Sequence, residues 1–170
     1  MVFEKMELTG KRQQDEALLL EQLGALLEPS EGRILTRISS LANASALLGM
    51  YLERVNWVGF YLRDTDSTTG EDYLQLGPFH GAPACVRIAV GKGVCGTACA
   101  TGKTQLVPDV HAFPGHIACD SASQSELVVP LMVEGRVVGV LDIDSPDLAR
   151  FSSQDARFVE QVAQLISVSW

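Results

Sequence analysis

Two apolar runs in the C-terminal half of the chain are separated by only two residues, Glu134-Gly135. The runs are Leu127–Val133 and Arg136–Ile143, and each is long enough to form a buried strand. A two-residue connection with glycine in its second position is typical of a β-hairpin. The two runs are therefore predicted to lie antiparallel, and any sheet in this protein has to be built around them.

Apolar residues recur at helical spacing both before and after this hairpin. Two N-terminal helices are predicted over residues 15–52, and Ser30 is expected to cap the second of them. A C-terminal helix is predicted over residues 152–170, because Ser152 and Asp155 have the spacing of a capping box.

Alternation of apolar and polar residues predicts further strands at Asn56–Leu62, Tyr73–Leu76, Cys85–Val90 and Thr104–Val107. Short loops and one glycine-rich short helix connect them, in place of full crossover helices. This order predicts an α+β fold with a central, mostly antiparallel sheet, N- and C-terminal helices packed on one face, and active-site loops on the other. A single domain is expected over residues 1–170, with the sheet and loops at residues 56–145.

The charge of the chain excludes some classes of partner. There are 21 acidic and 13 basic residues, a net charge of −8, and the basic residues do not cluster, so a nucleic-acid partner is not expected. Membrane binding is not expected either, since no run approaches the roughly 20 apolar residues of a span. The first residues lack the order of a signal peptide, which predicts a cytoplasmic protein. In that reducing compartment, the four cysteines are candidates for catalytic, redox or metal-binding roles.

Cys119 has different surroundings from the other cysteines. Pro114 and Gly115 precede it, and a polar stretch follows it before the first hairpin strand. A rigid scaffold often presents a reactive group on such a loop, so Cys119 is the candidate nucleophile. Cys85, at the start of a strand, and Cys95, near a helix N-terminus that favours a thiolate, are candidates for resolving its oxidised form.

Two other motifs have weaker interpretations. Gly91-x-Gly93-x-x-Gly96 matches a dinucleotide-binding fingerprint, but the helix after it is too short for a crossover, so the glycines are predicted to permit a tight turn. Structural zinc prefers paired cysteine knuckles, and only Cys95 and Cys99 are close in the sequence. Neither a bound cofactor nor a metal is expected.

Two carboxylates, Asp142 and Asp144, stand two residues apart on the second hairpin strand and therefore share a face. Placing them side by side is unfavourable unless they bind a cation or hold a proton. Val138 and Val140 are expected on the same face, which would make it at least partly buried. The pair is interpreted as functional.

Glu126 joins these acids only if the hairpin contains a register break. A two-residue turn pairs Val133 with Arg136, and counting back places Glu126 on the opposite face from both aspartates. One extra residue reverses this relation. A break is therefore predicted between Glu126 and Arg136, near Pro130 or the turn.

Trp57 and Tyr61 share one face of the strand at residues 56–62. Aromatic faces suit a thioether or its methyl group, so the two rings are candidates for walls of a substrate pocket.

Several stretches together resemble the free methionine-(R)-sulfoxide reductases, a family of single-domain enzymes with the GAF fold. The matching stretches are Asn56–Leu62, Leu76–Phe79, Ala84–Ile88, Gly91–Gly96, Val110–Asp120 and Leu141–Ser145. Cys99 and His80 depart from the family pattern.

The resemblance implies that the protein reduces free L-methionine-(R)-sulfoxide to L-methionine. It implies Cys119 as nucleophile, Cys85 as the main resolving thiol and Cys95 as a secondary one. It also implies a substrate pocket lined by Trp57, Tyr61, Glu126, Asp142 and Asp144. Thioredoxin or another dithiol would be the external reductant, and both a monomer and a homodimer remain open.

Two alternative functions follow from the same residues. A GAF domain can sense a small molecule without catalysis, although such domains are usually joined to an output domain. The cysteines could also serve a thiol-based redox sensor. Turnover of free methionine sulfoxide with a dithiol separates both alternatives from the enzyme.

Overall fold

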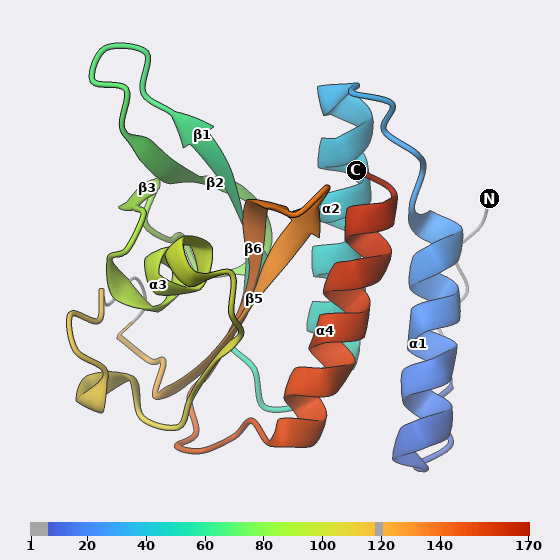
Figure 1. Cartoon of the computed structure of the whole chain (residues 1–170). Helices are drawn as coiled ribbons and strands as arrows, with labels where there is room; N and C mark the ends of the chain where they lie inside the picture. Colours follow the sequence, from blue (N-terminus) through green and yellow to red (C-terminus); the bar gives the residue numbers. More distant parts are fainter. Residues whose placement is uncertain (1–6, 118–120) are drawn as a thin grey trace.

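The computed structural model describes residues 7–117 and 121–170 (Figure 1). Within these residues the α-helices are α1 (Arg12–Leu26), α2 (Ile34–Tyr51), α3 (Gly93–Thr101) and α4 (Ser153–Val168), with a 3-10 helix, η1, at Val110–Ala112. The strands are β1 (Trp57–Thr65), β2 (Asp72–Gly81), β3 (Arg87–Ala89), β4 (Gln105–Val107), β5 (Ser125–Val133) and β6 (Arg136–Ser145). None of the helices in this part of the chain has the length and apolar character that a membrane span requires.

The strands form one sheet in the order β3-β2-β1-β6-β5-β4, and every neighbouring pair is antiparallel. Helices α1, α2 and α4 lie together on one side of the sheet, and α3 lies on the other side with the loops (Figure 1). The predicted α+β fold is confirmed, with the hairpin β5–β6 near the centre of the sheet.

The sheet separates two hydrophobic cores. The helix-side core joins α1, α2 and α4 to residues such as Phe60, Leu141 and Ile143. The site-side core joins α3 to Trp57, Tyr61 and residues of β5 and β6. Because both faces of the central strands are covered, polar groups on the site side are buried unless a pocket reaches them.

The register break in the hairpin is confirmed. Val133 pairs with Arg136 across the turn, but the register shifts between Leu131 and Met132, and beyond the shift Glu126 stands opposite Asp144. The extra residue is on β6, where Val138 has no partner between Val137 and Gly139. The register shift therefore begins one residue after Pro130, close to the predicted position. The bulged residue itself is on β6, whereas Pro130 is on β5.

The bulge changes the face of one residue. Val138 packs against the helix-side core, whereas Val140 belongs to the site-side core. The expectation that Val138 shares the face of Asp142 is wrong, because a bulged residue interrupts the alternation of the strand. The burial of Asp142 therefore rests on other groups of the site side, such as Val140, Val128 and the packing of α3 against β6.

Of the two helix caps predicted from the sequence, one is present and one is not. The predicted capping box of α4 is present, with Ser152 and Asp155 each bonding the other's backbone N–H. Ser30 does not cap α2, which begins after Arg33 without a side-chain cap. Glu31 and Gly32 have positive φ angles of 49° and 78°, so a turn separates Ser30 from the helix.

Strand β2 is longer than the strand predicted at Tyr73–Leu76. β2 continues to Gly81, which pairs with Trp57. The register shifts between Gly59 and Tyr61, where Gly77 and Pro78 of β2 stand opposite the single residue Phe60 of β1. β3 is shorter than predicted and begins at Arg87, so Cys85 precedes the strand.

The glycine motif forms a tight turn into α3. Gly91 and Gly93 have positive φ angles of 83° and 62°, which glycine adopts readily. A Cβ atom on Gly96 would lie 2.4 Å from the carbonyl oxygen of Ala89, so α3 touches the sheet backbone here. The antiparallel neighbours of β3 and β4 also differ from a dinucleotide-binding βαβ unit.

Alanine at Gly96 is therefore expected to push α3 off the sheet and lower the free energy of unfolding by about 2 kcal/mol or more. The matched control is Gly24→Ala in α1, where a Cβ would meet only Leu165 at 3.9 Å. That change should stabilise the protein by about 0.5–1 kcal/mol. Urea denaturation of both variants measures the contrast; equal effects would show that α3 does not depend on this close approach.

Candidate active site

Three carboxyl groups meet on the side of the sheet that α3 covers. Glu126 on β5 is the register partner of Asp144 on β6, and Asp142 lies two residues before Asp144 on the same face. All three line a pocket with an empty volume of about 380 Å³. The N-terminal end of α3, residues 92–95, forms a second wall, and His116, Ile117 and Ser123 form a third.

Burial of this cluster changes its proton affinity. Glu126 and Asp142 are each only 6% exposed. Burial raises the pKa of Asp142 to about 6. The pKa of Glu126 is raised well above its ordinary value, first by burial and then by the negative charges of Asp142 and Asp144. Because Glu126 receives both effects, it holds a proton more readily than an ordinary glutamic acid.

Cys95 is part of the carboxyl cluster. Its Sγ atom lies 3.9 Å from Oε1 of Glu126, in the geometry of a thiol donor. Burial, followed by the charges of Asp142 and Glu126, raises the pKa of Cys95 well above its ordinary value. The expectation that the N-terminus of α3 favours a thiolate here is wrong, because desolvation and two carboxylates outweigh the helix dipole.

Trp57 and Tyr61 lie deeper than the pocket. They are 2% and 1% exposed, and their rings stack on each other with centroids 5.9 Å apart. The Trp57 indole N–H donates to the carbonyl of Ala82 at 3.0 Å, and the Tyr61 hydroxyl donates to the carbonyl of Cys85 at 3.1 Å. The two aromatic residues thus hold the segment that carries Cys85, and neither is among the described residues that line the pocket.

The cysteines differ in their states. Cys85 is disulfide-bonded, whereas Cys95 and Cys99 are free and buried. Cys119, the candidate nucleophile, lies outside the described residues. The described residues on both sides of it, Ile117 and Ser123, line the carboxyl pocket.

Sequence reasoning missed three polar residues that line the pocket: Lys92, His116 and Ser123. His116 Nε2 approaches Oε2 of Glu126 at 4.0 Å, and the Ser123 hydroxyl accepts a hydrogen bond from the Asn56 amide at 3.1 Å. Membership of the Cys119 loop was an available signal for His116 and Ser123. Lys92 lies inside the glycine motif and carried no signal of its own.

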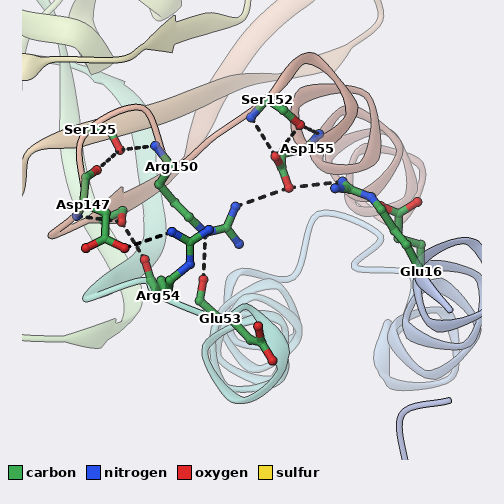
Figure 2. A network of polar contacts seen from close by, with 10 residues as sticks. Glu16, Glu53, Arg54, Ser125, Asp147, Arg150, Ser152 and Asp155 are labelled. Carbon is green, nitrogen blue, oxygen red and sulfur yellow. Dashed lines mark hydrogen bonds and ion pairs between the residues drawn. The ribbon is translucent and has the colours of Figure 1, made fainter. Parts of the chain in front are cut away.

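A polar network holds the start of β5, next to Glu126 in the sequence (Figure 2). Ser125, adjacent to Glu126, donates to the carbonyl of Asp147 at 2.6 Å and accepts from the backbone N–H of Arg150 at 3.3 Å. The Arg150 guanidinium reaches the carbonyl of Glu53 at 2.9 Å and Asp155 at 3.4 Å. The start of β5 is therefore tied to the end of α2 and to the cap of α4.

One group within the pocket has donor atoms suited to a metal. One atom each from Cys95, Glu126 and Asp142 lies within 4.8 Å of the others, and all three residues are buried. Oδ1 of Asp142 is buried and has no hydrogen-bond partner among the described residues. The pocket can therefore accept either a hydrogen-bond donor or a cation.

Known proteins are similar to this chain in sequence and fold. The GAF domain family matches residues 32–170. A free methionine-R-sulfoxide reductase from Escherichia coli is 53% identical over 132 residues, covering 77% of this chain and 76% of that protein. A free methionine-R-sulfoxide reductase from Saccharomyces cerevisiae is 44% identical over 157 residues, covering 89% of this chain and 85% of that protein. The solved structure of free methionine-R-sulfoxide reductase from Neisseria meningitidis in complex with its substrate has a TM-score of 0.86 and 39% identity, covering 98% of this chain and 94% of that chain.

The buried carboxyl cluster should lower stability at neutral pH. Well below pH 3.8, Asp142 is protonated in both the folded and the unfolded protein. As the pH rises from 3.8 to about 6, only the unfolded protein ionises readily, so stability falls, and above about pH 6 the loss is complete. The pKa values of about 6 and 3.8 correspond to a penalty of about 3 kcal/mol at about 1.4 kcal/mol for each pH unit between them.

Asp142→Asn should therefore raise the free energy of unfolding by up to about 3 kcal/mol at pH 7.5 and change it little at pH 4. Urea denaturation at both pH values measures this difference. Asp147→Asn, at an exposed ion pair with Arg54, is the control and should change stability by less than about 1 kcal/mol. A variant no more stable than wild type at pH 7.5 would contradict the assigned protonation.

Proposed function

Since this chain belongs to the GAF domain family and, within it, to the free methionine-R-sulfoxide reductases, we propose that it reduces free L-methionine-(R)-sulfoxide to L-methionine. The observation that carries the proposal is the buried carboxyl pocket between the residues that flank Cys119. Relatives named for this activity cover most of the chain, and the pocket supplies the chemistry that the reaction needs.

In the proposed reaction, the Cys119 thiolate attacks the sulfoxide sulfur. The oxygen passes from the substrate sulfur to Cys119, so the S–O bond of the substrate breaks and that of a sulfenic acid forms. The substrate sulfur is reduced by two electrons and the cysteine sulfur is oxidised by two. Negative charge develops on the oxygen during the transfer, so a nearby acid lowers the barrier.

We assign this acid role to Glu126. Its pKa is raised by burial and by two neighbouring carboxylates, so it keeps its proton to higher pH than an ordinary glutamic acid and can donate it to the sulfoxide oxygen. Asp142 has an oxygen without a hydrogen-bond partner in the described part of the chain. Together with Asp144, this carboxylate suits the α-ammonium group of a free amino acid. In this scheme, the buried rings of Trp57 and Tyr61 hold the segment that carries Cys85 and do not contact the substrate.

The enzyme is then regenerated by thiol chemistry. The Cys85 thiol attacks the sulfenic sulfur of Cys119, a disulfide forms, and the oxygen leaves as water. The bonded state of Cys85, beside free thiols at Cys95 and Cys99, supports this assignment. Thioredoxin or another external dithiol reduces the disulfide by exchange, and the reaction requires no bound cofactor.

The raised pKa of Cys95 argues against its use as a second resolving thiol. A resolving cysteine reacts as its thiolate, and the pKa of Cys95 is raised well above its ordinary value. The proposed scheme therefore uses Cys85 for resolution and leaves Cys95 within the acid cluster.

A substrate comparison tests the function. With a dithiol, the protein should reduce the R epimer of free methionine sulfoxide and leave the S epimer unreacted. N-acetyl-methionine sulfoxide should have a kcat/KM at least about 100-fold lower, because it cannot pair with the buried carboxylates. Measuring methionine release from each compound decides the matter; equal rates for free and blocked substrates would exclude the ammonium-binding role, and no turnover of any sulfoxide would exclude the activity.

Cysteine variants test the thiol roles separately. Cys119→Ser should abolish methionine release, whereas Cys85→Ser should release about one equivalent in a single turnover, because the sulfenic acid forms before Cys85 acts. Thioredoxin-driven turnover of Cys85→Ser should fall sharply. Mass spectrometry of the oxidised wild type should show a Cys85–Cys119 bridge, and Cys99→Ser serves as a matched control. A bridge between Cys95 and Cys99 as the main product would contradict the scheme.

A further inference from the structure

We propose that the pocket formed by Cys95, Glu126 and Asp142 also binds a thiophilic divalent cation, for which Zn²⁺ is the best match. The second half of the inference, that the cation competes with the substrate, rests on the proposed function. The first half, cation binding itself, rests only on the geometry of the donor atoms.

The donor atoms are already close to the spacing of a zinc site. In a tetrahedral site with bonds of about 2.0–2.3 Å, ligand atoms are separated by roughly 3.3–3.7 Å. Here the Cys95 sulfur lies 3.9 Å from Oε1 of Glu126, and one atom from each of the three residues falls within 4.8 Å of the others. Small side-chain rotations are enough to bring them to bonding distance.

The ligands come from a preformed scaffold. Glu126 and Asp142 lie on adjacent strands within a stretch of unbroken pairing, Ser125 to Leu131 on β5. Cys95 lies in the first turn of α3, which packs against both strands. A cation would therefore find three ligands without ordering a loop. Preorganisation of this kind is what a binding site for a metal requires.

Asp142 supplies an independent reason to expect a ligand. Its Oδ1 atom is buried and lacks a hydrogen-bond partner among the residues that the structure describes, and the residue faces the pocket. A buried oxygen in this state is costly to the folded protein. A cation bound between Asp142 and Glu126 would remove that cost.

The mixed donor set selects the class of metal. A thiolate with carboxylate oxygens suits Zn²⁺ and Co²⁺, whereas Ca²⁺ and Mg²⁺ require oxygen donors alone. His116 lies 4.0 Å from the second oxygen of Glu126, where its imidazole can either complete the coordination or hold Glu126 in place as an outer partner. This site differs from the cysteine-only zinc knuckle that the sequence disfavours, since two of its ligands are carboxylates.

Cation binding would compete with the substrate in the proposed enzyme. The cation would occupy the position of the substrate ammonium and bind the carboxyl that protonates the sulfoxide oxygen. The expected result is inhibition by Zn²⁺ that excess substrate relieves. None of the three metal ligands takes part in the Cys85 disulfide, so the site is expected to persist in the oxidised protein.

Cobalt provides a direct test, because a thiolate bound to Co²⁺ gives a charge-transfer absorption band. Untagged protein is oxidised with diamide until a denaturing thiol assay finds two free thiols in each chain, which removes Cys85 and Cys119 as ligands. Titration with Co²⁺ should give a saturable band at one equivalent, and Zn²⁺ should displace it. Cys95→Ser should lose the band, and Glu126→Gln should weaken Co²⁺ binding by at least about 10-fold.

Cys99→Ser is the matched control, since Cys99 is also free and buried on α3 but is not part of the cluster. The variant should keep the band unchanged. Absence of saturable binding, or a band that survives in Cys95→Ser, would overturn the inference. Because this titration uses neither substrate nor reductant, its failure is separate from a failure of the proposed activity, which methionine release measures without metal.

Discussion

The pairing of β5 with β6 is the interaction on which the rest of the molecule depends. It lies near the centre of the sheet, between the two cores, and sets Glu126 opposite Asp144. The helical layer fixes the start of β5 through Ser125 and Arg150 (Figure 2). A carboxyl cluster on this hairpin is therefore as rigid as the fold itself, which is what precise positioning of a small, flexible substrate demands.

The same pairing creates an electrostatic conflict. Burial on the site side raises the pKa values of Glu126, Asp142 and Cys95, and folding alone gains nothing from it. Proteins retain such groups where an unfavourable arrangement serves binding or catalysis. The apolar packing of three helices against the opposite face offsets this local cost, together with the site-side core. Both faces of the sheet therefore contribute to stability, and one of them also carries the carboxyl cluster.

Much of this arrangement could be predicted from the sequence, and the errors have physical causes. Counting residues around the Glu134-Gly135 turn was sufficient to predict that the register must break. The strand that would carry the bulge could not be predicted, because it depends on whether Val138 finds a place in the helix-side core. The shared face of Trp57 and Tyr61 followed from alternation, but their depth depends on hydrogen bonds to backbone carbonyls, which leave no mark in the sequence.

The bulge at Val138 has a consequence for how a protein of this kind can diverge. Substitutions around it leave the pattern of inward and outward residues intact, but a change in chain length does not. One inserted or lost residue between the turn and Gly139 would exchange the acidic face of β6 with its apolar face. The hairpin is thus expected to tolerate insertions or deletions of two residues but not of one. Whether the number of residues between the turn and Gly139 is odd or even therefore matters more for building this site than which residues they are.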